Sequence, residues 1–208
     1  MQTKIKGIKS YSGAETDIIT TEGGVLISLD QRLLWTAKGY GYQARTTSAV
    51  AAVADEPTTT ALFTLWNGES GGGKVYVIEG LLANQDISGT AESRWTMFAC
   101  VHPVGMSAVT ADITKINSTR GIASYGGNAR LDVGATVVDD GWYPVMNSLD
   151  VEPTGVLGGA GAYVPICGTL MVPPTAGISL HIYASSVDED FNVGFKWFEV
   201  PQSELAME

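Results

Sequence analysis

Apolar side chains alternate with polar or small ones along residues 58–200. Successive side chains of an extended chain point to opposite faces, so this period of two predicts strands that bury one face. β-branched and aromatic runs, bounded by Gly, Asn, Asp or Ser, mark the strand positions. The seven predicted strands are 61–66, 75–82, 95–102, 131–138, 163–172, 178–185 and 191–200, and an eighth is expected within 113–124 or 24–30.

This set of strands predicts an all-β fold. Seven or eight strands joined by turns, without helical periodicity between them, are typical of an antiparallel two-sheet sandwich. Eight strands favour a jelly roll, with an immunoglobulin-like order as the alternative. The only segment with helical character is 48–55, which ends before Pro57. Alternation assigns these side chains to the core: Val164, Leu170, Leu180, Ile182 and Phe195.

The clearest pair of strands is 163–172 followed by 178–185. The five residues between them read Pro-Pro-Thr-Ala-Gly, which are turn formers in a number that suits a hairpin loop. A hairpin closed by this loop pairs Val172 with Ile178 and Leu170 with Leu180.

Charge and pattern divide the chain into three segments. The formal net charge is −10, but residues 1–45 contain six basic and four acidic side chains, so the remainder carries −12. The alternation is broken in residues 1–57 and regular beyond them. We therefore predict an extended N-terminal arm over 1–57, a β-sandwich domain over 58–201 and a C-terminal tail over 202–208.

The composition argues against several kinds of partner and location. A strongly acidic surface repels nucleic acid and anionic lipid, so direct contact with nucleic acid or a membrane is not expected. No run of 18 apolar residues occurs, and the first residues lack the apolar stretch of a secretory signal. An intracellular product is expected. Cys100 and Cys167 are too few for a disulfide framework.

Residues 68–74 match the spacing G-x-x-x-x-G-K of a phosphate-binding loop. Such a loop continues with Ser or Thr and then a helix, because the hydroxyl binds magnesium and the helix N-terminus faces the phosphates. Val75 instead opens a predicted strand. A glycine-rich turn is therefore expected at this position.

No other motif in the sequence predicts chemistry. Acidic residues gather at 139–140 and 188–190, where turns are required, and no G-x-S-x-G sequence is present, so triad chemistry is not expected. Structural zinc motifs place their ligands in close pairs on turns, which is not the spacing of Cys100, His102, Cys167 and His181. We predict no cofactor, no metal site and no catalytic residue.

Aromatic and apolar residues outside the predicted core are candidates for partner contact. Trp142 and Tyr143 follow the acidic turn, and aromatic side chains concentrate at interfaces. In the arm, lysines would face acidic partner groups, and apolar side chains would contribute more than exposed charges. The candidate residues in the arm are Lys4, Ile5, Lys6, Ile8, Lys9, Leu33, Leu34 and Trp35.

Apolar side chains also occupy strand faces that are predicted to point outward. They are Val75, Val77, Leu81, Phe98, Met171 and Phe198. A monomer rarely exposes so many, so another subunit or the arm is expected to cover some of them. We predict a homotrimer.

Four segments resemble structural proteins that tailed bacteriophages encode. They are Leu-Trp-Asn-Gly-Glu at 65–69, Cys-Val-His-Pro at 100–103, Val-Val-Asp-Asp-Gly-Trp at 137–142, and 172–181, which runs from Val-Pro-Pro to Ser-Leu-His. In these segments the chain resembles the small β-sandwich proteins that decorate or cement phage capsids. The resemblance implies a trimeric or multimeric jelly roll without catalysis. Its partner would be the major capsid protein, its location the virion surface after synthesis in the host cytoplasm, and no functional residue is transferred.

Two other functions remain open. Jelly rolls often hold carbohydrate sites, so a carbohydrate- or receptor-binding module of a tail or fibre is the alternative. The third is an enzyme, a hydrolase that uses Glu79 or the pair Asp139-Asp140.

Overall fold

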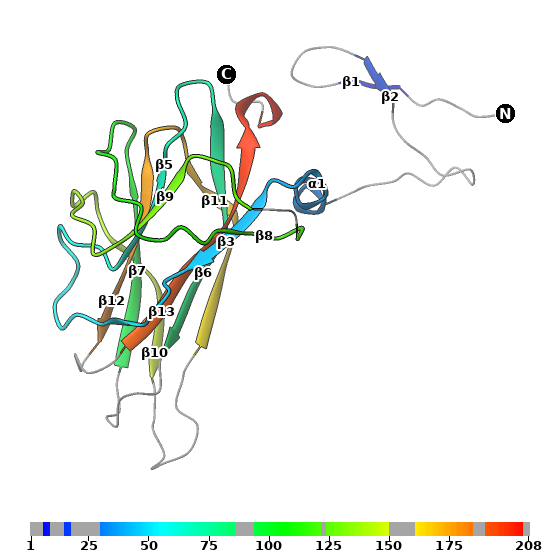
Figure 1. Cartoon of the computed structure of the whole chain (residues 1–208). Helices are drawn as coiled ribbons and strands as arrows, with labels where there is room; N and C mark the ends of the chain where they lie inside the picture. The colour runs from blue at the N-terminus through cyan, green and yellow to red at the C-terminus, as the bar shows by residue number, and fades with distance from the viewer. Residues whose placement is uncertain are drawn as a thin grey trace.

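The computed structural model describes residues 6–8, 15–17, 30–85, 94–121, 124–149, 161–184 and 190–205. Two antiparallel sheets pack face to face, which confirms the predicted all-β two-sheet sandwich (Figure 1). One sheet has the strand order β10 (Tyr143–Leu149), β7 (Arg94–His102), β12 (Gly177–Ala184), β5 (Phe63–Asn67) and β9 (Ala129–Val133). The other has the order β11 (Gly161–Val172), β6 (Lys74–Gln85), β13 (Asp190–Pro201), β3 (Gly41–Arg45) and β8 (Asn117–Ser118), and β4 (Val50–Ala51) pairs with β13.

Four further elements among the described residues lie outside the two sheets of the sandwich. The strands β1 (Lys6–Ile8) and β2 (Glu15–Asp17) form a separate antiparallel ladder. The helix α1 (Gln31–Lys38) precedes β3, and the 3-10 turn η1 (Gln202–Glu204) follows β13.

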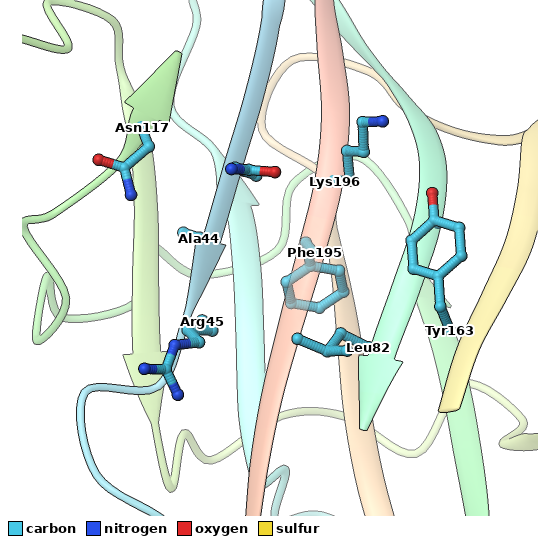
Figure 2. Close-up of a pocket in the computed structure, with 9 residues that line it drawn as sticks. Ala44, Arg45, Leu82, Asn117, Tyr163, Phe195 and Lys196 are labelled. Atoms are coloured by element: carbon cyan, nitrogen blue, oxygen red, sulfur yellow. The ribbon is translucent and has the colours of Figure 1, made fainter. Parts of the chain in front are cut away.

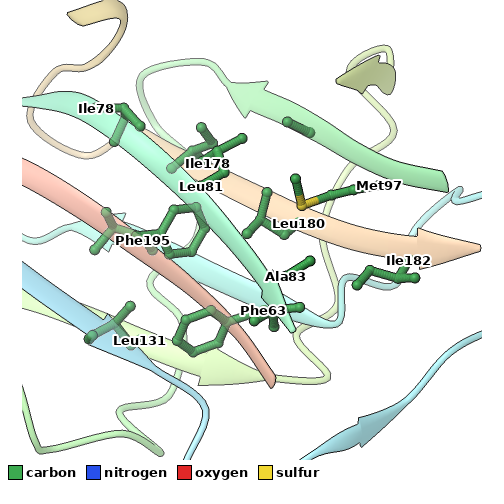
Figure 3. Close-up of a cluster of buried hydrophobic side chains, with 14 of the residues drawn as sticks. Phe63, Ile78, Leu81, Ala83, Met97, Leu131, Ile178, Leu180, Ile182 and Phe195 are labelled. Carbon is green, nitrogen blue, oxygen red and sulfur yellow. The ribbon is translucent and has the colours of Figure 1, made fainter. Parts of the chain in front are cut away.

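The core lies between the two inner sheet faces (Figure 3). Leu180 and Ile182 of β12 are fully buried, and Phe63 of β5 stacks on Phe195 of β13 with ring centroids 5.4 Å apart. Each such side chain contributes about 1.5–3 kcal/mol of stabilisation when buried. Of the predicted core residues, Leu180, Ile182 and Phe195 are buried, while Val164 and Leu170 are partly buried against the cluster.

All seven predicted strands are present, with small shifts at their ends. The largest difference is at β9, which ends at Val133 rather than at residue 138. Gly134 follows with a positive φ of 74° and interrupts the strand, and the chain then continues beside the residues that precede β5, where Thr136 bridges Thr60. An eighth strand was expected within 113–124, and β8 lies there.

The predicted hairpin between β11 and β12 is wrong. Val172 pairs with Tyr76 of β6, whereas Ile178 pairs with Leu65 of β5 and with Val101 of β7. Pro173 and Pro174 have no amide hydrogen to continue a ladder, and the turn after them leads the chain from one sheet to the other. Asn67 supports this crossing, because its side-chain amide donates to the carbonyls of Val172 and Lys74.

The predicted boundary of the arm at residue 57 also needs correction. β3 pairs with β13 over five residues and is an integral strand of the six-stranded sheet. Residues 48–55 are not helical, because β4 pairs with β13 and Val53 bridges Tyr183. The sandwich therefore includes residues from 41 onward, within the segment predicted as arm.

The helix α1 was not predicted, although its signals are in the sequence. The Asp30 side chain accepts a hydrogen bond from the Arg32 amide, and Gly39 closes the helix in the left-handed conformation at φ 82°. Trp35 is the one side chain of this helix that is buried, and its ring packs on Phe198 at 5.5 Å between centroids.

Docking of α1 explains where several outward-pointing apolar residues go. Trp35, Val77, Phe198 and Val200 form a small cluster on the outer face of the six-stranded sheet, with Tyr40 and Leu205 against it. Lys38 and Tyr40 bind the carboxylate of Glu204 at 2.7 and 2.9 Å, which ties α1 to η1. Of the residues predicted to be exposed, Val75, Val77, Leu81 and Phe198 are buried within this chain, whereas Met171 is exposed and Phe98 half-buried.

Candidate functional site

A chain of hydrogen bonds crosses the outer face of the five-stranded sheet. Asp140 Oδ2 lies 2.8 Å from His102 Nδ1, and His102 Nε2 lies 2.8 Å from Ser179 Oγ. Ser179 Oγ is also 2.9 Å from Thr64 Oγ1. A neutral imidazole satisfies all four groups, because Nδ1 donates to the carboxylate and Nε2 accepts from the serine hydroxyl.

Strand alternation and one turn bring these residues together. Ser179 pairs with Thr64 across β12 and β5, so both point outward while Ile178 and Leu180 point into the core. His102 ends the neighbouring strand β7. Asp140 comes from a turn in which Gly141 has a φ of 95° and donates to Asp139 Oδ1, as expected for an acidic turn.

Trp142 covers this network. Its ring lies edge-on to His102 at 6.3 Å and to His181 at 5.8 Å, and its Nε1 donates to the carbonyl of Thr58. Burial lowers the pKa of His181, which favours the neutral form of its ring. Trp142 was predicted as a candidate for partner contact, and the structure places it mainly against its own sheet.

The order Asp140–His102–Ser179 is that of a nucleophilic triad, which the sequence did not predict because no nucleophile motif is present. Ser179 is 0% exposed and His102 1% exposed. A nucleophile must reach a substrate carbonyl, and in this arrangement the strand and its covering loops close off the serine. The arrangement therefore serves as a polar tie between the turn at 139–141 and the sheet.

The tie supports an apolar surface patch at the end of β7. We call this the end patch; it consists of Val101, Val104, Val138 and Tyr143, which are 37%, 64%, 65% and 72% exposed. Two adjoining shallow depressions at this end share Pro103, Val104 and Asp140, and Val101 and Val138 line them. Tyr143 lines neither depression; it lies opposite Ala99 in the ladder, on the face of the sheet that Val101 shares with Ile178.

The other predicted contact residues lie elsewhere. Leu33 and Leu34 are exposed on α1, whereas Trp35 is buried against this chain's own Phe198. Lys6 and Ile8 belong to β1, and Lys4, Ile5 and Lys9 lie outside the described residues.

The four Cys and His residues do not gather into one site. Cys100, His102 and His181 belong to the five-stranded sheet, whereas Cys167 is an exposed residue of β11 in the other sheet. Cys100 is buried 3.9 Å from His102, and burial raises the pKa of its thiol. Within the described ranges, no group of three His, Cys, Asp or Glu residues could hold a metal ion.

A second buried polar cluster lies at one end of the core. Glu199 is 1% exposed and accepts hydrogen bonds from Tyr125 at 2.6 Å and from Lys74 at 3.3 Å. Burial raises the pKa of the Glu199 carboxyl, and these donors partly offset the rise.

Comparisons of the chain with protein-family models, with curated proteins and with solved structures found no match. In the part of the chain that the structure describes, no helix is long and apolar enough to cross a membrane.

Proposed function

We propose that the chain is a non-catalytic structural protein of a phage virion that decorates or cements the capsid. The observation that supports this role is the end patch. Its side chains come from β7, β10 and the loops beside them, and the hydrogen bond from the buried His102 to the partly exposed Asp140 fixes the turn between Val138 and Tyr143. Exposed apolar groups held in a fixed shape are typical of surfaces that bind another protein.

The order of the strands supports the jelly roll that this role implies. In the described residues, and apart from β4, β8 and β9, the two sheets contain eight strands, which are β3, β5, β6, β7, β10, β11, β12 and β13. The first pairs with the eighth, the second with the seventh, the third with the sixth and the fourth with the fifth. A long antiparallel hairpin wound into two sheets gives this order, and viral capsid proteins and lectins use it. Fold alone leaves the function open.

The proposed partners are a second and third copy of this chain and the major capsid protein. The end patch is the proposed contact between copies in a homotrimer. The N-terminal segment that precedes α1, together with Leu33 and Leu34, is the proposed contact with the capsid lattice. Leu33 and Leu34 point away from the sheet that binds Trp35 and are therefore free for such a contact.

Light scattering of the purified full chain tests the contact between copies. We expect a trimer for the wild type and a monomer for the triple variant Val104→Ser, Val138→Ser and Tyr143→Ser. Met171→Ser is the matched control, since Met171 is an exposed apolar residue outside the end patch, and it is expected to stay trimeric. A wild-type monomer at micromolar concentration, or a trimeric patch variant, contradicts the assignment.

A carbohydrate- or receptor-binding module is the second candidate function. One observation favours it: the outer face of the six-stranded sheet has a groove. The polar tie lies on the other, five-stranded sheet.

A further inference from the structure

A groove crosses the strands on the outer face of the six-stranded sheet (Figure 2). The ladder places its residues in two rows. One row runs from Gly80 through Lys196 and Gln43 to Asn117, and the other joins Tyr163, Leu82, Gly194 and Arg45. Residues in register on neighbouring strands share a face, so the side chains of both rows point outward.

Each row contains a glycine whose outer side is occupied by a neighbour. At Gly80 a Cβ would collide with the phenol of Tyr163, so the tyrosine ring lies over this glycine. At Gly194 a Cβ would lie 2.6 Å from the carbonyl oxygen of Ala44. The groove that these rows line has a volume of about 280 Å³. This is near the lower end of the range for small-molecule sites, roughly 300–1,000 Å³, and suits one sugar ring.

The groove is cationic in an acidic protein. Arg45 and Lys196 line it, and no carboxylate does. Within the described residues neither cation has an ion-pair partner, although the chain has 22 acidic side chains against 12 basic ones. Two unpaired cations in a concave site attract an anionic group, and the guanidinium of Arg45 presents a fork of donors that matches a carboxylate.

The remaining lining groups suit the rest of a sugar. Gln43 and Asn117 carry amides that both donate and accept, as ring hydroxyls require. Tyr163 is half exposed and presents an aromatic face beside the cations, as Figure 2 shows, where it lies across β13 from Arg45. Such a face packs on the apolar C–H side of a pyranose ring.

We propose that this groove binds an acidic sugar residue, such as a uronic acid at the end of a surface polysaccharide. The ring packs on Tyr163, the carboxylate is directed toward Lys196 and Arg45 on the neighbouring strands β13 and β3, and a hydroxyl binds Gln43. This site lies on the other sheet from the tie that supports the end patch, so the full chain can be tested for it whether or not that patch mediates assembly.

The test is a titration of the full chain, followed by NMR, with two ligands that differ only in the carboxylate: methyl glucuronoside and methyl glucoside. We expect saturable binding of the glucuronoside and at least tenfold weaker binding of the glucoside. Sulfate is expected to compete weakly. The proposal is overturned if both sugars bind equally or if the glucuronoside shows no saturable binding. It is also overturned if sulfate displaces the glucuronoside as strongly as free glucuronate, added as a second competitor, does.

Variants locate the binding to the groove. Arg45→Gln and Tyr163→Ala are each expected to weaken glucuronoside binding at least tenfold, with the melting temperature unchanged in Arg45→Gln and cooperative melting retained in Tyr163→Ala. Arg120→Gln is the matched control, because Arg120 is exposed and lies outside the groove. The proposal fails if Arg45→Gln binds like the wild type, or if Arg120→Gln loses as much affinity as Arg45→Gln.

Discussion

The carboxylate of Asp140 lies 2.8 Å from Nδ1 of His102 and joins a surface turn to the last residue of β7. The other ring nitrogen of His102 hydrogen-bonds to Ser179 of β12, the central strand of the five-stranded sheet. The turn therefore carries a hydrogen-bonded connection into the sandwich, and Val138 and Tyr143, on either side of it, are held in place.

Asp140→Ala tests this connection. Removing the carboxylate leaves the buried Nδ1 of His102 without its partner, which costs about 1–3 kcal/mol. We expect the free energy of unfolding, measured by urea denaturation, to fall by roughly this amount. Asp139→Asn is the control, since an Asn side chain can still accept from the Gly141 amide. If Asp140→Ala were as stable as Asp139→Asn, the tie would have no structural role.

Trp35→Ala tests the docking of α1 on the outer sheet face. Truncating a buried aromatic side chain typically costs about 3–5 kcal/mol. We expect α1 to detach, Val77 and Phe198 to become exposed, and amide hydrogens at the end of β13 to exchange faster. Leu33→Ala, at a position that is 59% exposed, is expected to change neither measurement. Unchanged exchange in Trp35→Ala would show that α1 docks through other contacts.

Glu199 predicts a pH dependence of stability. Because burial raises the pKa of its carboxyl above the usual value, the folded chain binds more protons than the unfolded chain above about pH 4.3. The free energy of unfolding contributed by this group therefore falls as pH rises from about 4.3 through the folded pKa. In Glu199→Gln this loss disappears.

The measurement compares Glu199→Gln with the wild type by urea denaturation between pH 4 and pH 7. The difference in unfolding free energy, variant minus wild type, is expected to rise with pH. Glu56→Gln, at an exposed position, is expected to show a constant difference. A difference that falls with pH in Glu199→Gln would mean that Lys74 and Tyr125 outweigh burial.

Truncations test where the sandwich begins. Deleting residues 1–29 removes no strand of either sandwich sheet, so the shortened chain is expected to melt cooperatively near the wild-type temperature. Deleting residues 1–57 removes α1, β3 and β4, exposes the edge of β13 and is expected to abolish cooperative melting. If both shortened chains melted cooperatively, the sandwich domain would begin after residue 57, as the sequence predicts.

Alternation predicted seven of the strands, because the period of two fixes which side chains a strand buries. It missed β3, β4 and β10, and it assigned Leu81, which lies in the core, to an outer face. It does not specify which strand lies beside which. Leu170 and Leu180 have the pattern of neighbours in a hairpin, yet they belong to different sheets, where they pair with Ile78 and Phe63. The chain crosses between the sheets at Pro173 and Pro174, and the side chain of Asn67 supports this crossing. Asn67 and Val172 are 105 residues apart, so no local sequence pattern indicates their hydrogen bond.

The candidate site was less predictable than the fold. Asp140 and Tyr143 were recognised as a turn acid and an exposed aromatic, but nothing in the sequence relates Asp140 to His102 or His102 to Ser179. Their meeting depends on the pairing of β7 with β12. The same holds for α1. Its capping residues Asp30 and Gly39 can be recognised in the sequence, but the contact of Trp35 with Phe198 depends on the tertiary structure.

The composition of purified particles tests the proposed virion role most directly. Phage particles are assembled with the wild-type chain, or with the triple variant Val104→Ser, Val138→Ser and Tyr143→Ser, and purified on a density gradient. Quantitative mass spectrometry then gives the ratio of this chain to the major capsid protein. We predict a fixed ratio for the wild type and for Met171→Ser, and at least a tenfold lower ratio for the folded patch variant, because a monomer holds the lattice through one N-terminal segment and a trimer through three. Absence of the wild-type chain from the particles, or an unchanged ratio in the patch variant, would contradict the account.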